Sequence, residues 1–196
     1  MKTRKLVAAI CISLVTAGMA VVGSSVAQAA PCGGTYSLGV GGVTGGDSRV
    51  FGATQPVGYS ALPFAFSIDE GVRELDRLYH DQRRVCPGQR VKVIGHSNGA
   101  AVVSTWFSLA HRHNTSGILL GNPKREGTGI SAITGLPNGP TNSNYNGAPV
   151  LDVCQVRDPI CNHPAGPNGY FDGTHTNYAY SPNAYSDYAN GNIWIG

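Results

Sequence analysis

Apolar side chains recur every three to four residues in two segments of the sequence, which is the spacing of one helix face. The first segment covers residues 67–84, where Ser67 and Glu70 have the spacing of a capping box, each side chain accepting from the other's free backbone N–H. A Cys-Pro-Gly sequence at 86–88 ends it. The second segment covers residues 98–113. The pattern therefore predicts two amphipathic helices.

Short apolar runs rich in β-branched residues alternate with these helices and predict buried strands. They lie at residues 35–42, 91–94, 118–120 and 150–153. Residues 122–148, rich in Gly, Asn and Pro, predict a long loop, and the chain after residue 174 has no clear period. This alternation is typical of a mostly parallel sheet with helices on its faces. We expect the functional residues just beyond the carboxyl ends of the strands.

The first thirty residues have the composition of a secretory signal peptide. Their basic residues stand at the start, residues 6–22 are apolar, and small residues at 27–30 offer a cleavage site. The alternative is an uncleaved anchor, but the apolar run is short for a spanning helix and ends in small polar residues. We expect cleavage after Ala29 or Ala30, one domain over residues 31–196, and no stable membrane insertion afterwards.

Removal of this segment changes the charge of the chain. The sequence carries 14 Lys and Arg against 11 Asp and Glu, and three of the basic residues but no acidic ones lie in the first thirty. The remainder is therefore formally neutral. A neutral domain without a basic stripe lacks the electrostatic footprint of a nucleic-acid-binding protein, so we expect no nucleic-acid partner. A neutral or apolar substrate fits this balance better than an anionic polymer.

Four of the five cysteines follow the predicted signal peptide, an even number that suits disulfides in an oxidising compartment. Cys154 and Cys161 lie seven residues apart and are expected to close a tight loop, which leaves Cys32 to pair with Cys86. Zinc binding is the alternative. However, the sequence has no C-x-x-C spacing, and an oxidising compartment disfavours free thiolates.

Residues 95–99 read Gly-His-Ser-Asn-Gly, a G-x-S-x-G motif between a predicted strand and a predicted helix. In a nucleophile elbow the serine stands in a strained turn, glycines prevent clashes, and the helix N-terminus adds a positive dipole end. The alternative is a structural turn that happens to carry serine, because 27 of the 196 residues are glycine. The strand before the motif and the Ala-rich helix after it favour Ser97 as a nucleophile.

In this type of site an acid and then a histidine follow the serine in the chain. Asp158 lies just past the last predicted strand, where a Cys154–Cys161 disulfide would hold a carboxylate rigidly, whereas Asp152 falls inside that strand. His175 lies in a loop that can reach back over Ser97. The other histidines after the motif are His111, His113 and His163. Position alone leaves the choice of base open.

An oxyanion hole in such a site uses backbone N–H groups. The first donor is expected from Asn98, the residue after the nucleophile. The second is expected from the loop after the first strand, where the candidates are Gly42, Val43 and Thr44. The Thr44 hydroxyl could also donate.

Together these motifs resemble the cutinase family, including its bacterial members and the related PE-PPE esterase domain. Residues 120–125 (LGNPKR) resemble the family's Gly-Asp/Asn-Pro-x-Arg segment, residues 154–161 (CQVRDPIC) its C-x-x-x-D-x-x-C loop, and residues 175–178 (HTNY) its H-x-x-Y. The resemblance implies that Asp158 is the triad acid and His175 the base. The sequence departs from the family pattern at His96, at Arg157, and at the loop 41–46, which lacks Arg-Gly-Ser/Thr-Glu.

The resemblance implies a small α/β-hydrolase, a three-layer sandwich with a mostly parallel central sheet. It also implies two-step acyl transfer on an ester or lipid substrate, a reaction that needs no cofactor or metal. We expect a secreted, extracellular, monomeric serine esterase acting on cutin- or polyester-like esters or on short-to-medium acyl esters. The alternatives are a lipase or cell-envelope mycolyl-ester hydrolase on the same triad, and an inactive secreted binding domain.

Overall fold

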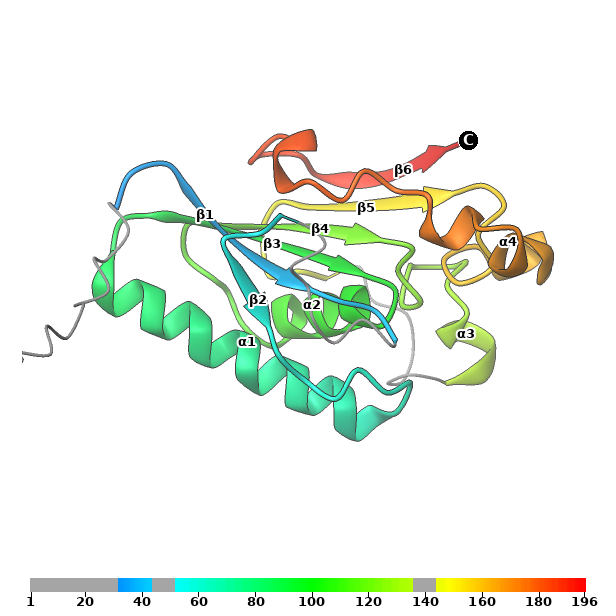
Figure 1. Cartoon of the computed structure of the whole chain (residues 1–196), viewed down its shortest axis with the longest axis horizontal. Helices are drawn as coiled ribbons and strands as arrows, with labels where there is room; N and C mark the ends of the chain where they lie inside the picture. Colours follow the sequence, from blue (N-terminus) through cyan, green and yellow to red (C-terminus); the bar gives the residue numbers. More distant parts are fainter. Residues whose placement is uncertain (1–31, 44–51, 136–143) are drawn as a thin grey trace, which may run out of the picture. The chain divides into compact units, whose positions relative to one another are not determined.

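A sheet of parallel strands forms the centre of the domain. The computed structural model describes residues 32–43, 52–135 and 144–196, so the predicted signal peptide lies outside the described residues. Within them the sheet has six strands in the order β2-β1-β3-β4-β5-β6, and every neighbouring pair is parallel (Figure 1). The strands are β1 (Thr35–Val40), β2 (Gln55–Val57), β3 (Arg90–His96), β4 (Thr115–Leu120), β5 (Val150–Gln155) and β6 (Gly191–Ile195). The predicted α/β fold is confirmed.

Two long helices, α1 (Ala65–Val85) and α2 (Asn98–Leu109), lie together on one face of this sheet (Figure 1). Leu38, Val93 and Leu119 point from the strands into the core on this side, where they pack with Trp106 and Phe107 of α2. Because α2 packs against both the sheet and α1, it is buried over most of its length. Apolar packing is therefore what holds this layer in place.

The C-terminal segment, residues 174–190, covers the opposite face of the sheet. Successive residues of a strand point to opposite faces, so Ile94 belongs to a second core with Val153 and Tyr178. The segment contains two short 3-10 helices, Thr174–Thr176 and Pro182–Ala184. The expected helical cover is thus present on one face, and mostly irregular chain forms the third layer on the other.

The start of α1 differs from the prediction. The helix begins at Ala65, and its N-cap makes no side-chain hydrogen bond. Ser67 Oγ instead accepts from the backbone N–H of Leu62 at 2.9 Å, and the Glu70 carboxylate accepts from that of Ser60 at 3.0 Å. The predicted capping box is therefore wrong, because both side chains bind the loop before the helix rather than each other's backbone.

Other element bounds also differ from the prediction. The helix predicted to reach His113 ends at Leu109, where the chain becomes extended before a left-handed turn at Asn114 (φ 51°) leads into β4. The two edge strands β2 and β6 were not predicted. β2 has three residues including a proline, and the β6 side chains are mostly exposed, so neither carries the alternation of a half-buried strand. The predicted loop 122–148 contains a short helix, α3 (Ser131–Thr134).

Two disulfides tie the described chain together, in the pairing that the sequence predicts. Cys32–Cys86 joins the segment before β1 to the end of α1, and Cys154–Cys161 closes the loop that follows β5. In the described parts of the chain, no helix is both long enough and apolar enough to cross a membrane.

Candidate active site

Ser97 stands in the sharp turn between β3 and α2. Its backbone has φ 55° and ψ −120°, outside the regions that L-residues favour, and its N–H donates to Leu120 O at 2.9 Å. A Cβ at Gly99 would lie 2.1 Å from Val40 O, and one at Gly95 would lie 2.5 Å from Gly99 O. Both glycines of the motif are therefore required for the helix to approach the strands so closely.

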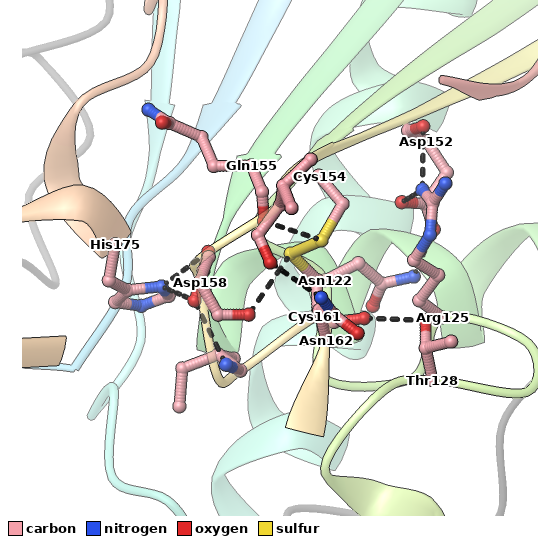
Figure 2. Close-up of a disulfide and its surroundings, with 12 residues drawn as sticks. Asn122, Arg125, Thr128, Asp152, Cys154, Gln155, Asp158, Cys161, Asn162 and His175 are labelled. Atoms are coloured by element: carbon pink, nitrogen blue, oxygen red, sulfur yellow. Dashed lines mark hydrogen bonds and ion pairs between the residues drawn. A yellow bond between two sulfur atoms is a disulfide. The ribbon is translucent and has the colours of Figure 1, made fainter. Parts of the chain in front are cut away.

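The structure brings Ser97, His175 and Asp158 together from three separate segments. His175 Nε2 lies 2.8 Å from Ser97 Oγ, and Nδ1 lies 2.9 Å from each carboxylate oxygen of Asp158. Asp158 lies within the Cys154–Cys161 loop and points toward His175 (Figure 2). Because a carboxylate only accepts hydrogen bonds, Nδ1 carries the proton and the Nε2 lone pair faces the serine hydroxyl.

The Asp158 carboxylate is fully buried yet remains ionised. Burial opposes its charge, but hydrogen bonds from His175, Tyr178 and the backbone N–H of Ile160 outweigh that penalty and hold the pKa of Asp158 below its usual range. A buried anion beside an imidazole stabilises the imidazolium form when the ring accepts a proton. The arrangement can therefore support general-base chemistry at Ser97.

Gly121 allows Asp158 and His175 to lie in contact. Its φ is +56°, and a Cβ there would lie 2.8 Å from Asp158 Oδ2 and 3.0 Å from His175 Cε1. The residue directly follows β4, and its own N–H donates to Val153 O at 3.1 Å. Sequence reasoning used this glycine only as part of the LGNPKR resemblance and missed its steric role.

His96, which departs from the family pattern, supports the backbone of His175. Its Nε2 lies 2.8 Å from the His175 carbonyl oxygen, and the two imidazole rings are 4.8 Å apart. Burial lowers the pKa of His96 to about 4, so the ring is neutral at neutral pH and Nε2 carries its single proton toward the carbonyl. Its sequence position between Gly95 and Ser97 gave no indication of this contact.

The oxyanion candidates that the structure describes, namely Gly42, Val43 and Asn98, lie close to Ser97. The backbone N–H of Asn98, in the first turn of α2, has no acceptor within the helix, and the side chain is held by a hydrogen bond of 2.9 Å to Leu62 O. A Cβ at Gly42 would lie 3.0 Å from Ser97 Cβ, so the chain after β1 passes directly beside the serine. Val43 lines the same pocket as Ser97, whereas Thr44 lies outside the described residues.

A pocket of about 270 Å³ opens at Ser97, with mostly apolar walls. It is lined by Val43, Pro63, Ser97, Asn98, Pro123, Ile130, Thr134, Ile160 and Tyr170. Tyr170, from the short helix α4 (Asn168–Phe171), also stacks on the His175 ring at 5.4 Å. Exposed apolar side chains adjoin these walls in the chain, namely Leu62, Phe64, Ile133 and Phe171. The pocket can therefore accept an uncharged, apolar group next to the serine.

The remaining candidate residues have other partners. Asp152 forms a buried ion pair with Arg125 at 2.5 Å and accepts from Asn122 at 2.7 Å, on the far side of the disulfide from His175 (Figure 2). His163 bonds Thr128 O, and His111 bonds Asn146 O. Among residues 32–43, 52–135 and 144–196, no group of three or more His, Cys, Asp or Glu could hold a metal ion.

A parallel sheet with a strained serine between a strand and a helix, in contact with a histidine–aspartate pair, defines the α/β-hydrolase class. The sequence matches the family model of cutinase over residues 16–191. The chain therefore belongs to the cutinase family and is an ester hydrolase. The match begins within the predicted signal peptide.

The solved structure of a cutinase-like protein shares the fold at low sequence identity, and two further solved structures show weaker similarity. A cutinase-like protein from Cryptococcus sp. has a TM-score of 0.56 at 19% identity, covering 76% of this chain and 87% of that one. The catalytic core of acetyl xylan esterase from Trichoderma reesei has a TM-score of 0.49 at 14% identity, over 76% and 97%. Lysin B from Mycobacteriophage D29 has a TM-score of 0.42 at 23% identity, and the match covers only 47% of this chain and 47% of that one. A comparison with curated protein sequences gives no match.

Proposed function

We propose that the protein is a secreted serine esterase with Ser97, His175 and Asp158 as its catalytic triad. The observation that carries the proposal is the continuous series of contacts from Ser97 Oγ through both His175 nitrogens to the Asp158 carboxylate. His175 Nε2 takes the serine proton as Oγ attacks the ester carbonyl, and then returns it to the leaving alcohol. Water hydrolyses the acyl-enzyme by the same route in reverse.

The oxyanion of each tetrahedral intermediate binds one donor at the start of α2 and a second in the loop after β1. Asn98 N–H supplies the first hydrogen bond, helped by the positive end of the helix dipole. The second comes from the loop after β1, at Val43 or Thr44. The close approach of Gly42 to the Ser97 side chain supports this assignment, because it puts the start of that loop beside the serine.

The substrate is a neutral carboxylic ester with a short-to-medium acyl chain, free or as part of a cutin- or polyester-like polymer. The pocket volume of about 270 Å³ and its uncharged walls support an apolar acyl group of limited length. The exposed Phe64 and Phe171 near the pocket support contact with an apolar surface. A lipase or mycolyl-ester hydrolase would instead be fastest on long acyl chains, so rates on p-nitrophenyl esters of increasing chain length separate the two.

The composition of residues 1–30 and the two disulfides support export from the cell. The exported protein should begin at Ala30 or Pro31. N-terminal sequencing of protein recovered from the culture medium tests this. Recovery of the intact N-terminus in the membrane fraction would contradict it.

Hydrolysis of p-nitrophenyl butyrate tests the triad. Ser97→Ala should lower kcat/KM at least about a thousandfold, because it removes the nucleophile. Ser108→Ala is the matched control, since Ser108 lies on the same helix and bonds only the turn before it, at Thr105 O. A fluorophosphonate probe should label wild type and the control but not Ser97→Ala. Turnover by Ser97→Ala equal to that of wild type would refute the proposal, and a wild type that neither hydrolyses the ester nor takes the label would favour an inactive binding domain.

A further inference from the structure

Tyr178 lies three residues after His175 and reaches the acid of the triad from the second core. Its ring is buried there, with 8% of the residue exposed. Its hydroxyl oxygen lies 2.5 Å from Asp158 Oδ2. The proton transfers of acyl transfer do not pass through this residue, although it is in direct contact with the carboxylate.

The hydrogen bonds around the phenol fix where its proton points. The hydroxyl oxygen accepts from the backbone N–H of Gln155 at 3.1 Å. Cys161 Sγ, 3.5 Å away, belongs to a disulfide and has no proton to donate. The phenol has one proton and the Asp158 carboxylate can only accept, so the proton points to Oδ2. Burial first, and then the charge of Asp158, raise the pKa of Tyr178, so the phenol stays a donor throughout the working pH range.

The phenol is one of two fixed donors that hold the carboxylate from its two ends. The backbone N–H of Ile160 donates to Oδ1 at 2.9 Å, and Tyr178 donates to Oδ2. Between these donors, both oxygens lie 2.9 Å from His175 Nδ1. Rotation of the carboxylate would break at least one of these bonds. Because Asp158 is fully buried, the phenol also does the work that a water molecule would do at an exposed acid.

We propose that Tyr178 is a positioning residue of the triad, whose phenol sets both the orientation of the Asp158 carboxylate and the strength with which that carboxylate attracts the His175 proton. The inference rests on the proposed function, since it assigns a role within that triad. Without the phenol, more negative charge faces the imidazolium, and the base holds its proton more tightly. The loss of one donor also lets the carboxylate rotate, so the base is held less well for attack.

The test compares Tyr178→Phe with Tyr180→Phe, which removes a hydroxyl from the same segment but one that bonds Thr176 O rather than the acid. Tyr178→Phe should lower kcat on p-nitrophenyl butyrate about tenfold, with little change in KM. The acid limb of its kcat/KM profile should move up by about half a pH unit, because activity needs neutral His175. Tyr180→Phe should match wild type in both. An acid limb that stays in place or moves down in Tyr178→Phe would overturn the proposal, whatever the loss of rate.

A second measurement does not depend on turnover. In the Ser97→Ala background, NMR titration of the His175 imidazole should give a higher midpoint with Tyr178→Phe than without it. Replacing Tyr178 with 3-fluorotyrosine keeps the ring and both hydrogen bonds but makes the phenol a stronger donor, so the midpoint should move down and the fold should be kept. Failure of the proposed function would appear as an unlabelled wild-type Ser97. Failure of this inference alone would appear as a wild type that the probe labels normally, together with equal His175 midpoints in the Ser97→Ala proteins that carry tyrosine, phenylalanine or 3-fluorotyrosine at position 178.

Discussion

The two faces of the sheet hold the two halves of the site by different means. On the helical face, α2 and the strands meet through apolar side chains and through glycines that let backbones touch, and Ser97 is fixed by that packing. On the opposite face, the irregular C-terminal segment packs Tyr178 against Ile94 and Val153, and hydrogen bonds to its backbone carbonyls hold it in addition. Lys92 Nζ donates to Pro182 O and Tyr185 O, and His96 donates to His175 O. The proposed nucleophile is therefore held by the packed core, and the proposed base by a layer that also depends on polar contacts, here called the polar layer.

This difference predicts that small steric changes will act on stability on one face and on activity on the other. Gly99→Ala should have the largest effect. Its Cβ would meet the backbone oxygen of Val40, which cannot move without shifting β1, so we expect a loss of unfolding free energy of about 4 kcal/mol or more, or no folded protein. Gly121→Ala would instead press on the side chains of Asp158 and His175. It should remain folded and lose roughly a hundredfold in kcat.

Urea unfolding and p-nitrophenyl butyrate hydrolysis, measured on both variants, check this contrast. Gly88→Ala is the control, because no atom lies within 4 Å of a Cβ built there. It should change stability by no more than about 0.5 kcal/mol and leave activity unchanged. A fully stable Gly99→Ala, or a fully active Gly121→Ala, would remove the distinction between the two faces.

The two disulfides test the same comparison. Removing either is expected to lower the free energy of unfolding somewhat less than Gly99→Ala does. Cys32–Cys86 spans 54 residues of the helical half, and loop-closure entropy gives it about 4 kcal/mol of stabilisation. Cys154–Cys161 spans seven residues and should contribute only about 2 kcal/mol. The short loop holds Asp158, however. Paired Cys→Ser replacement should therefore lower the melting temperature more for the long disulfide and lower kcat more for the short one.

Circular dichroism melts and initial rates on the two double variants measure these effects. The rates should be taken well below both melting temperatures, so that unfolding does not enter. If the variant without Cys154–Cys161 keeps wild-type kcat, the disulfide does not hold the acid, and the carboxylate is positioned by its hydrogen bonds alone.

The sequence predicted the central strands and the two long helices better than the C-terminal segment and β6, for a physical reason. Helices that pack by apolar contact leave a periodic pattern in the chain and fully buried strands leave a continuous apolar run, and residues 91–94 and 118–120 were predicted from such runs. The C-terminal segment has almost no regular secondary structure, so its apolar residues have no helix or strand period, and many of its hydrogen bonds use backbone carbonyls, which every residue has. The strand β6, whose side chains are mostly exposed, was missed for the same reason.

The site shows the same division. Ser97 was identified from a local motif, whereas position alone could not choose His175, and only the resemblance to a family selected it. The capping box failed because Ser67 and Glu70 found partners in the preceding loop, a tertiary contact that no short motif encodes. The hydrogen bonds of His96 and Tyr178 likewise join residues 79 and 20 positions apart in the chain. Such contacts depend on the completed fold.

His96 offers the mildest way to probe the polar layer, through the pH dependence of stability. Its pKa is about 4 in the folded protein because burial opposes the charge, and about 6.5 in the unfolded chain. Between these values the unfolded state binds more protons, so the stability that depends on neutral His96 is complete above about pH 6.5 and falls as the pH drops toward 4. At pH 4.5 the loss relative to pH 7 amounts to about 2.5 kcal/mol. His96→Phe cannot take up this proton. Urea unfolding at the two pH values should therefore show a stability difference smaller by about that amount in the variant. An unchanged difference would mean that the His96 ring takes up its proton without leaving the His175 carbonyl, and that the layer carrying the base tolerates a buried charge.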